Sequence, residues 1–194
     1  MGKTYVVSYI VAALCVLNTN AANIIWKIGK ADNSASELAL GPSSYKDFLA
    51  KDFGYEDRYF LIGNSKEDKD FPYVLPGPND VWGGTWRTSG WRTHSTNILF
   101  GLDRIAERGE CRLVIDLLDA DPKRSLVKVL VNSVEKKFEI KGKSEKVLDG
   151  VVDEAKEQVL EISIAASDLK IGGNIVTISV LEGGWIAFDQ VRLE

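Results

Sequence analysis

Three tryptophans and two arginines are concentrated in one turn-rich segment of the chain, residues 76–93. Glycine, serine and threonine separate the tryptophans, and each arginine directly follows one of them. An aromatic ring offers a flat apolar face to the C–H face of a sugar, and an arginine fork binds a carboxylate, such as that of a uronic acid, through two parallel hydrogen bonds. Together with two polar residues that could bond sugar hydroxyls, the candidate ligand-binding residues are Asn79, Asp80, Trp82, Trp86, Arg87, Trp91 and Arg92.

The same segment admits two other interpretations. Loops lie at the surface and carry recognition more often than packing, which favours ligand binding. The tryptophans could instead anchor the loop by packing inward, or they could form a docking face for a neighbouring domain. The other two tryptophans, Trp26 and Trp185, lie among aliphatic residues, so we predict that they pack in the core.

Residue types that serve in catalysis form no recognisable constellation here. The single histidine, His94, stands between a threonine and a serine with no nucleophile recognisable by spacing, and we expect a loop histidine. Asp116, Asp119 and Asp121 follow one another at the end of an apolar run, but the turn signal Asp121–Pro122 accounts for them. We therefore expect no catalytic residue in this chain.

The acidic residues indicate calcium as a candidate cofactor, and we expect no other. Ca²⁺ takes roughly six to eight oxygen ligands, mostly carboxylates and carbonyls. The candidate metal ligands are Asp32, in a short turn, and Asp189, in the last apolar run. Asp189 could instead hold a neighbouring loop by accepting hydrogen bonds from backbone N–H groups. No carboxylate loop with EF-hand spacing occurs in the sequence.

The first 22 residues have the pattern of a secretory signal peptide. Lys3 supplies a positive charge, Val6–Leu17 is apolar, and Asn18–Ala22 is polar and ends in small residues. The apolar run is shorter than the roughly 20 residues that a membrane-spanning helix needs. We therefore predict a signal peptide at residues 1–22 and one domain at residues 23–194, secreted or periplasmic, with no transmembrane segment in the mature chain.

Charge and cysteine content limit the classes of partner and the covalent cross-links that we expect. The chain has 24 Lys and Arg against 28 Asp and Glu, a formal net charge of −4, and no basic cluster, so a nucleic-acid partner is not expected. Cys111 is the only cysteine after the predicted leader, so we expect no intramolecular disulfide. Cys111 opens an apolar run and is predicted to be a small buried hydrophobe.

The elements that must position these residues are mostly short strands. Alternation and β-branched or aromatic content predict nine of them: residues 24–28, 57–62, 96–102, 112–118, 126–131, 136–140, 159–164, 175–181 and 185–193. Two short helices are expected, at Ser43–Lys51 and Val151–Glu157. Because strands and helices do not alternate, the pattern predicts an all-β fold, an antiparallel β-sandwich or jelly roll.

The order of several short motifs resembles a known family over nearly the whole predicted mature chain, Ile24–Glu194. The motifs are Ile25–Asp32, Tyr59–Gly63, Phe71–Tyr73, Pro76–Gly77–Pro78, Asp80–Trp82, Ile98–Leu102, Gly109–Leu113, Val131–Asn132, Asp168–Asn174 and Trp185–Leu193. They are similar to the β-sandwich domain of rhamnogalacturonan lyases and of related accessory modules of Bacteroides-type glycosidases.

That resemblance implies a galactose-binding-like jelly roll that lies beside a catalytic domain or subunit. In such lyases the bond-breaking residues belong to a separate, larger domain, so the resemblance does not imply catalysis in this chain; an enzyme in its own right is the third alternative. It favours a noncatalytic module that binds or positions a polysaccharide, with pectic rhamnogalacturonan as the candidate. The alternative is a structural docking module of a larger secreted glycoside hydrolase or polysaccharide lyase that binds no sugar itself.

Overall fold

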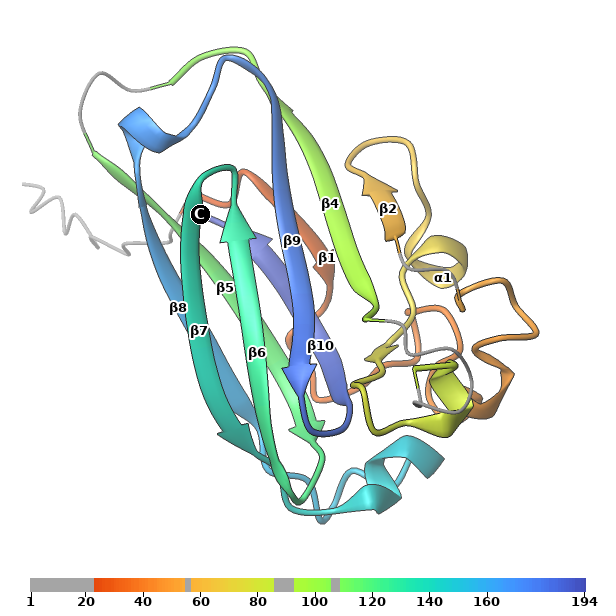
Figure 1. Ribbon diagram of the computed structural model, residues 1–194. Helices are drawn as coiled ribbons and strands as arrows, with labels where there is room; N and C mark the ends of the chain where they lie inside the picture. Colours follow the sequence, from red (N-terminus) through yellow and green to blue (C-terminus); the bar gives the residue numbers. More distant parts are fainter. Residues whose placement is uncertain (1–22, 55–56, 86–92, 106–108) are drawn as a thin grey trace, which may run out of the picture.

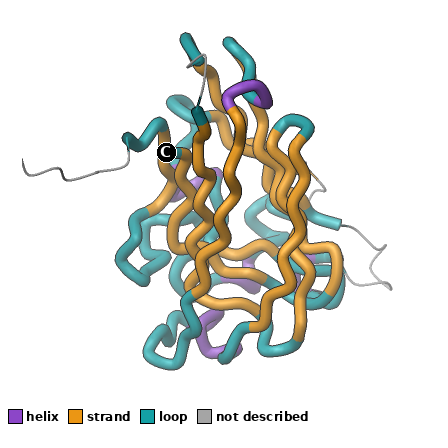
Figure 2. Tube along the Cα trace, turned by 90° about the vertical axis from the view of Figure 1, so that its left-hand side faces the viewer, coloured by secondary structure: helices purple, strands orange, loops and turns teal. Residues whose placement is uncertain are grey.

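Two β-sheets packed face to face form the body of the molecule in the computed structural model, which describes residues 23–54, 57–85, 93–105 and 109–194 (Figure 1). The predicted signal peptide lies outside the described residues, as do Trp86, Arg87, Trp91 and Arg92. Figure 2 shows that strands are the predominant regular element of the described chain and that its helices are short.

The first sheet has the strand order β1, β10, β5, β8, and β3 also pairs with β10. The second sheet has the order β2, β4, β9, β6, β7. The bounds of the first set are β1 (Trp26–Gly29), β3 (Val74–Leu75), β5 (Glu110–Ala120), β8 (Gln158–Ala165) and β10 (Ile186–Leu193). Those of the second are β2 (Asp57–Leu61), β4 (Ser95–Leu102), β6 (Arg124–Val131), β7 (Val134–Lys141) and β9 (Gly172–Glu182).

Strands β2 and β4 are parallel, whereas the other pairings between labelled strands of the described residues are antiparallel. A parallel pair cannot be joined by a tight hairpin and needs a long crossover connection. Residues 62–94 provide this connection, and they include the turn-rich segment that contains Trp82. The described part of the crossover and residues 30–54 lie on one side of the sandwich, on the right in Figure 1, where Tyr73 N–H donates to the carbonyl of Ala39 at 2.9 Å.

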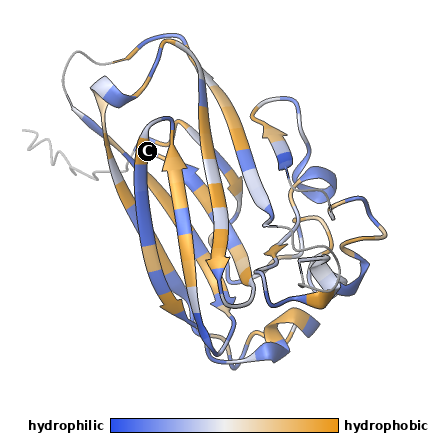
Figure 3. Cartoon of the chain, viewed as in Figure 1, coloured by the Kyte–Doolittle hydropathy of each residue, from blue (hydrophilic) through white to orange (hydrophobic). Residues whose placement is uncertain are grey.

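The core lies between the two sheets because alternate side chains of each strand point inward. In β6, Val127, Val129 and Val131 are fully buried while the residues between them are partly exposed. Figure 3 shows the contrast with β7, the edge strand beside it, whose residues are mostly hydrophilic. Burial of this continuous apolar layer is the main favourable contribution to folding.

All nine predicted strands are present, and the predicted all-β sandwich class is confirmed. The structure adds β3, which has two residues and therefore no readable alternation. Trp26 and Trp185 lie in the core as predicted, with 6% and 2% of their surfaces exposed. Cys111 is partly buried and packs against the core, and this burial raises the pKa of its thiol.

The two predicted helices are wrong in length or place. In the first, only Tyr45–Asp47 is helical, as the 3₁₀-helix η1. Residues 151–157 are not helical; instead the 3₁₀-helix η4 (Glu145–Asp149) precedes them, and it ends at Gly150, whose φ of +80° is left-handed. The described residues also form the helices α1 (Glu67–Asp70), η2 (Val81–Gly83) and η5 (Ala166–Asp168). Among the described residues, no helix is long and apolar enough to cross a membrane.

Candidate functional site

The first tryptophan of the turn-rich segment belongs to a group of packed rings, the Trp82 cluster, formed by Tyr45, Phe48, Trp82 and His94. Trp82 lies in η2, and its ring meets Tyr45 and Phe48 edge-on, at centroid distances of 5.1 and 6.0 Å. Phe48 is buried, whereas Trp82 and Tyr45 are only partly buried. The cluster therefore joins the predicted binding loop to η1 and leaves part of two aromatic side chains at the surface.

His94 connects the same loop to the sandwich. It directly precedes β4 and is 1% exposed, and its Nε2 lies 2.6 Å from the carbonyl oxygen of Gly83. Because a carbonyl only accepts, Nε2 carries the proton and donates it. The ring also packs edge-on against Phe48 at 5.6 Å. The predicted loop histidine is thus a buried link between η2 and β4.

Asp80 and Asn79 differ sharply in exposure. The Asp80 carboxylate is buried, and its Oδ2 accepts from Gly77 N–H at 2.8 Å within its own turn. Burial raises the pKa of Asp80 to about 7. Asn79 is exposed, and its backbone N–H donates to the carbonyl of Gly183 at 3.1 Å. Asp80 therefore holds the turn together from inside, while Asn79 presents its side chain at the surface.

A buried hydroxyl completes this turn. Thr85 is fully buried, and its Oγ1 lies within hydrogen-bond distance of the carbonyl oxygens of Gly77 and Asp80. The two ends of the turn are thereby tied to each other. The predicted roles of Trp86, Arg87, Trp91 and Arg92, which follow directly, stay predictions because these residues lie outside the described part of the chain.

Asp189, a candidate metal ligand, holds a loop in this structure. A β-bulge in β10 places it out of the regular register, and a bulge re-aims a side chain. Its two carboxylate oxygens accept from the backbone N–H groups of Asn33 and Ser34, at 3.3 and 3.1 Å. Burial raises the pKa of Asp189 to about 6, and the charges of Asp116 and Asp32 add to the rise. This is the loop-holding role that the sequence offered as the alternative to calcium binding.

The described residues do not assemble a metal site around that carboxylate. Asp32, the second candidate, is exposed in the turn beside it. No group of three or more His, Cys, Asp or Glu side chains in the described ranges is arranged to hold a metal ion. With both Asp189 oxygens bonded to amides, the donor set fits calcium poorly. Calcium binding at this position stays a prediction.

Two of the three carboxylates near the end of β5 also accept hydrogen bonds from the backbone. Asp119 is fully buried and accepts from the N–H groups of Lys143 and Ser144, at 3.0 and 3.1 Å. Asp121 accepts from Lys123 N–H at 2.6 Å, which is the turn that its position before proline predicts. Asp116 lies apart from these two contacts, opposite Gln190 of β10.

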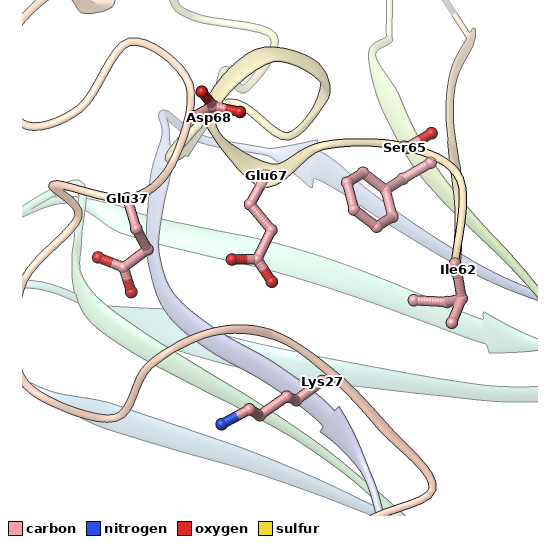
Figure 4. Close-up of a pocket in the computed structure, with 8 residues that line it drawn as sticks. Lys27, Glu37, Ile62, Ser65, Glu67 and Asp68 are labelled. Atoms are coloured by element: carbon pink, nitrogen blue, oxygen red, sulfur yellow. The ribbon is translucent and has the colours of Figure 1, made fainter.

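A pocket that the sequence did not indicate opens at the edge of the sandwich, where β1 and β2 end their sheets (Figure 4). This β1–α1 pocket has a volume of about 410 Å³. It is lined by Lys27, Glu37, Phe60, Ile62, Gly63, Ser65, Glu67 and Asp68. These residues come from β1, β2, α1 and the loops between them, so no local pattern could have brought them together.

The polar groups of this pocket are held by neighbouring backbone. Oε1 of Glu67 accepts from Gly29 N–H at 3.1 Å, which ties α1 to the end of β1. Ser65 Oγ accepts from Leu61 N–H at 3.0 Å. Oε1 of Glu37 is buried and has no hydrogen-bond partner among the described residues. Figure 4 shows the carboxylates of Glu37 and Glu67 both pointing toward β1, which carries Lys27.

A second cavity shares Asp68 of α1 with this pocket as a lining residue and measures about 470 Å³. It is also lined by Ser44, Asp47 and Lys51, in and around η1. Since Tyr45 of η1 belongs to the Trp82 cluster, the two cavities and the cluster follow one another along the loop-covered side of the sandwich.

Comparison with known proteins identifies the type of domain. A family model described as "CBM-like: Polysaccharide lyase family 4, domain III" matches residues 24–193. A search of curated proteins finds no match.

Several solved structures are similar to part of this chain. A family 35 carbohydrate-binding module from Cellvibrio japonicus Abf62 is 14% identical with a TM-score of 0.37, over 53% of this chain and 66% of that module. One from Clostridium thermocellum is 12% identical with a TM-score of 0.34, over 50% and 68%. A family GH115 4-O-methyl-α-glucuronidase with specificity for decorated arabinogalactans is 17% identical with a TM-score of 0.36; the similarity covers 53% of this chain and 14% of that enzyme.

Proposed function

Because the chain belongs to the CBM-like domain III family of polysaccharide lyase family 4, we propose that it binds polysaccharide without cleaving it, through the loop at residues 77–93. The observation that carries the choice of surface is the half-buried ring of Trp82, held edge-on against Tyr45 and Phe48. A ring fixed in this way presents a constant surface to a ligand.

The base of the loop is built to be rigid. Asp80 and Thr85 close its turn from inside, and His94 ties its far end to β4. A surface that is already ordered loses less conformational entropy when it binds. Exposed apolar side chains extend the surface: Val81 is 57% exposed beside Trp82, and Leu49 is 49% exposed.

The polar contribution rests on the residues predicted from the sequence. Trp86 and Trp91 would stack on sugar rings, and Arg87 and Arg92 would pair with uronate carboxylates, as in a pectic chain. Asn79, which is exposed at the base of the loop, would bond hydroxyl groups. A location outside the cytoplasm follows if residues 1–22 are a cleaved signal peptide.

Isothermal titration with soluble rhamnogalacturonan, homogalacturonan and galactan tests this proposal. We expect binding to at least one of them and a loss of about tenfold or more in affinity for a Trp86→Ala/Trp91→Ala variant, because stacking on each ring contributes on the order of 1 kcal/mol. Tyr59→Ala is the matched control, since Tyr59 is 59% exposed on β2. Absence of binding to every polysaccharide at millimolar sugar concentration would overturn the proposal and favour a docking module.

A further inference from the structure

We propose that the β1–α1 pocket is a separate saccharide subsite that holds one neutral sugar unit through adjacent hydroxyl groups. This inference rests on the proposed function and adds a substrate class to it. The pocket, at about 410 Å³, lies within the roughly 300–1,000 Å³ range of small-molecule sites.

An unsatisfied acceptor in the wall is the first support. Oε1 of Glu37 is buried and accepts no hydrogen bond from any described residue. A buried acceptor without a donor carries a desolvation cost, and native proteins satisfy most such groups. A ligand hydroxyl that donates to this oxygen would remove that cost.

The pocket is lined by an ammonium group and by carboxylates that form no ion pair with it among the described residues. Lys27 lines the pocket together with Glu37 and Glu67, but no ion pair joins it to either glutamate in the described part of the chain. A sugar hydroxyl both donates and accepts, so two adjacent hydroxyls match a carboxylate and an ammonium at the same time. Ser65, whose Oγ accepts from Leu61 N–H, keeps its own proton to donate.

The pocket also has an ordered frame and an apolar wall. Gly29 N–H fixes the carboxylate of Glu67, so this acceptor is oriented before any ligand arrives. Phe60 and Ile62 provide an apolar wall against which the C–H face of a sugar can pack. Such a combination of apolar lining and few oriented polar groups is typical of binding sites.

Charge selects a neutral sugar over a uronate. Three carboxylates and one ammonium line the pocket, which leaves it formally negative. A uronate carboxylate placed among Glu37, Glu67 and Asp68 would meet like charge, which is unfavourable at a desolvated contact. The pocket is thus chemically complementary to the loop at residues 77–93, where arginines are predicted to take uronates.

The two surfaces lie along one path. Asp68 lines both the β1–α1 pocket and the second cavity, and that cavity reaches η1, which contacts the Trp82 cluster. A polysaccharide with neutral and acidic units could therefore place a neutral unit in the pocket and an acidic stretch at the loop.

Chemical-shift mapping with simple glycosides tests the pocket independently of polysaccharide binding. Methyl rhamnopyranoside and methyl galactopyranoside are titrated into ¹⁵N-labelled protein, with galacturonic acid as the charged comparison. We expect a neutral glycoside to change the amide chemical shifts of Gly63 and Ser65. Galacturonic acid should bind there with an affinity at least about tenfold lower. Shifts absent from these amides, or equal affinity for galacturonic acid, would overturn the inference.

Removal of the acceptor provides the second arm. Glu37→Ala deletes both carboxylate oxygens, and we expect about a tenfold weaker affinity for the neutral glycoside. Glu135→Ala, at an exposed position on β7, is the matched control. Homogalacturonan binding, which the proposed function assigns to the loop at residues 77–93, should fall in the Trp86→Ala/Trp91→Ala variant. An unchanged glycoside affinity in Glu37→Ala would refute the subsite even if polysaccharide binding holds. Failure of all polysaccharide binding would refute the proposed function, and the glycoside titration would still decide the pocket.

Discussion

The Nε2 atom of His94 lies 2.6 Å from the carbonyl oxygen of Gly83, and this contact joins the end of η2 to the start of β4. It spans the segment in which Trp86, Arg87, Trp91 and Arg92 lie. This buried histidine and the rings packed around it therefore tie together the two described ends of the loop at residues 77–93.

Substitution of this histidine should destabilise the fold. His94→Phe keeps an aromatic ring against Phe48 but leaves the Gly83 carbonyl without its donor, so we expect the free energy of unfolding to fall by about 1–3 kcal/mol. His94→Ala also loses the packing and should fall further. Urea unfolding followed by tryptophan fluorescence measures both. A His94→Phe variant as stable as the parent would show that the bond contributes nothing.

The hydroxyl of Thr85 should stabilise the loop to a similar degree. Thr85→Val preserves the shape of the side chain but removes the donor near two buried carbonyl oxygens, of Gly77 and Asp80. We expect a loss of about 1–3 kcal/mol in the free energy of unfolding. Thr93→Val, at an exposed position in the same connection, is the control and should change stability by less than about 0.5 kcal/mol. Equal effects of the two substitutions would contradict this role.

Asp80 should make stability depend on pH between about 4 and 7. Burial raises its pKa in the folded protein to about 7, whereas an unfolded aspartate titrates near 4. Between these values the native state binds more protons than the unfolded state, so the free energy of unfolding falls as pH rises.

Asp80→Asn removes that titration. Relative to the parent, the variant should become more stable as pH rises from 4 to 8, by no more than about 4 kcal/mol, because one pKa unit corresponds to about 1.4 kcal/mol. Urea unfolding at several pH values measures the difference, with the exposed Asp153→Asn as control. A constant difference between variant and parent across this range would show that Asp80 titrates normally.

Asp189 should stabilise the protein with or without calcium. Asp189→Ala removes the acceptors of the Asn33 and Ser34 amides, and we expect the free energy of unfolding to fall by about 1–3 kcal/mol. Thermal melting in EDTA and in millimolar calcium chloride separates this role from metal binding. If the parent melts much lower in EDTA and the Asp189→Ala variant is insensitive to calcium, then calcium binding at Asp32 and Asp189 is supported and the loop-holding role alone is insufficient.

Local pattern was sufficient for the strands and for locating the turn-rich connection that holds the candidate site residues. Alternation reports which face of a strand is buried, so all nine long strands could be predicted, and the mixture of tryptophan with turn residues marked the connection between β2 and β4. The pattern failed where elements are short or irregular. β3 has only two residues, both buried, and η4 ends at Gly150, whose left-handed φ of +80° favours glycine.

Only the tertiary structure determines which groups the polar side chains contact. Sequence identified Asp80 and Asp189 as carboxylates of interest, but only the folded chain shows that each accepts backbone N–H groups of a nearby or distant loop. The β1–α1 pocket is the extreme case, because Lys27, Glu37 and Glu67 come from separate segments with no shared period. They lie close together because β1 and β2 are edge strands of the two packed sheets. The packing of two sheets depends on residues far apart in the sequence, which local periodicity does not predict.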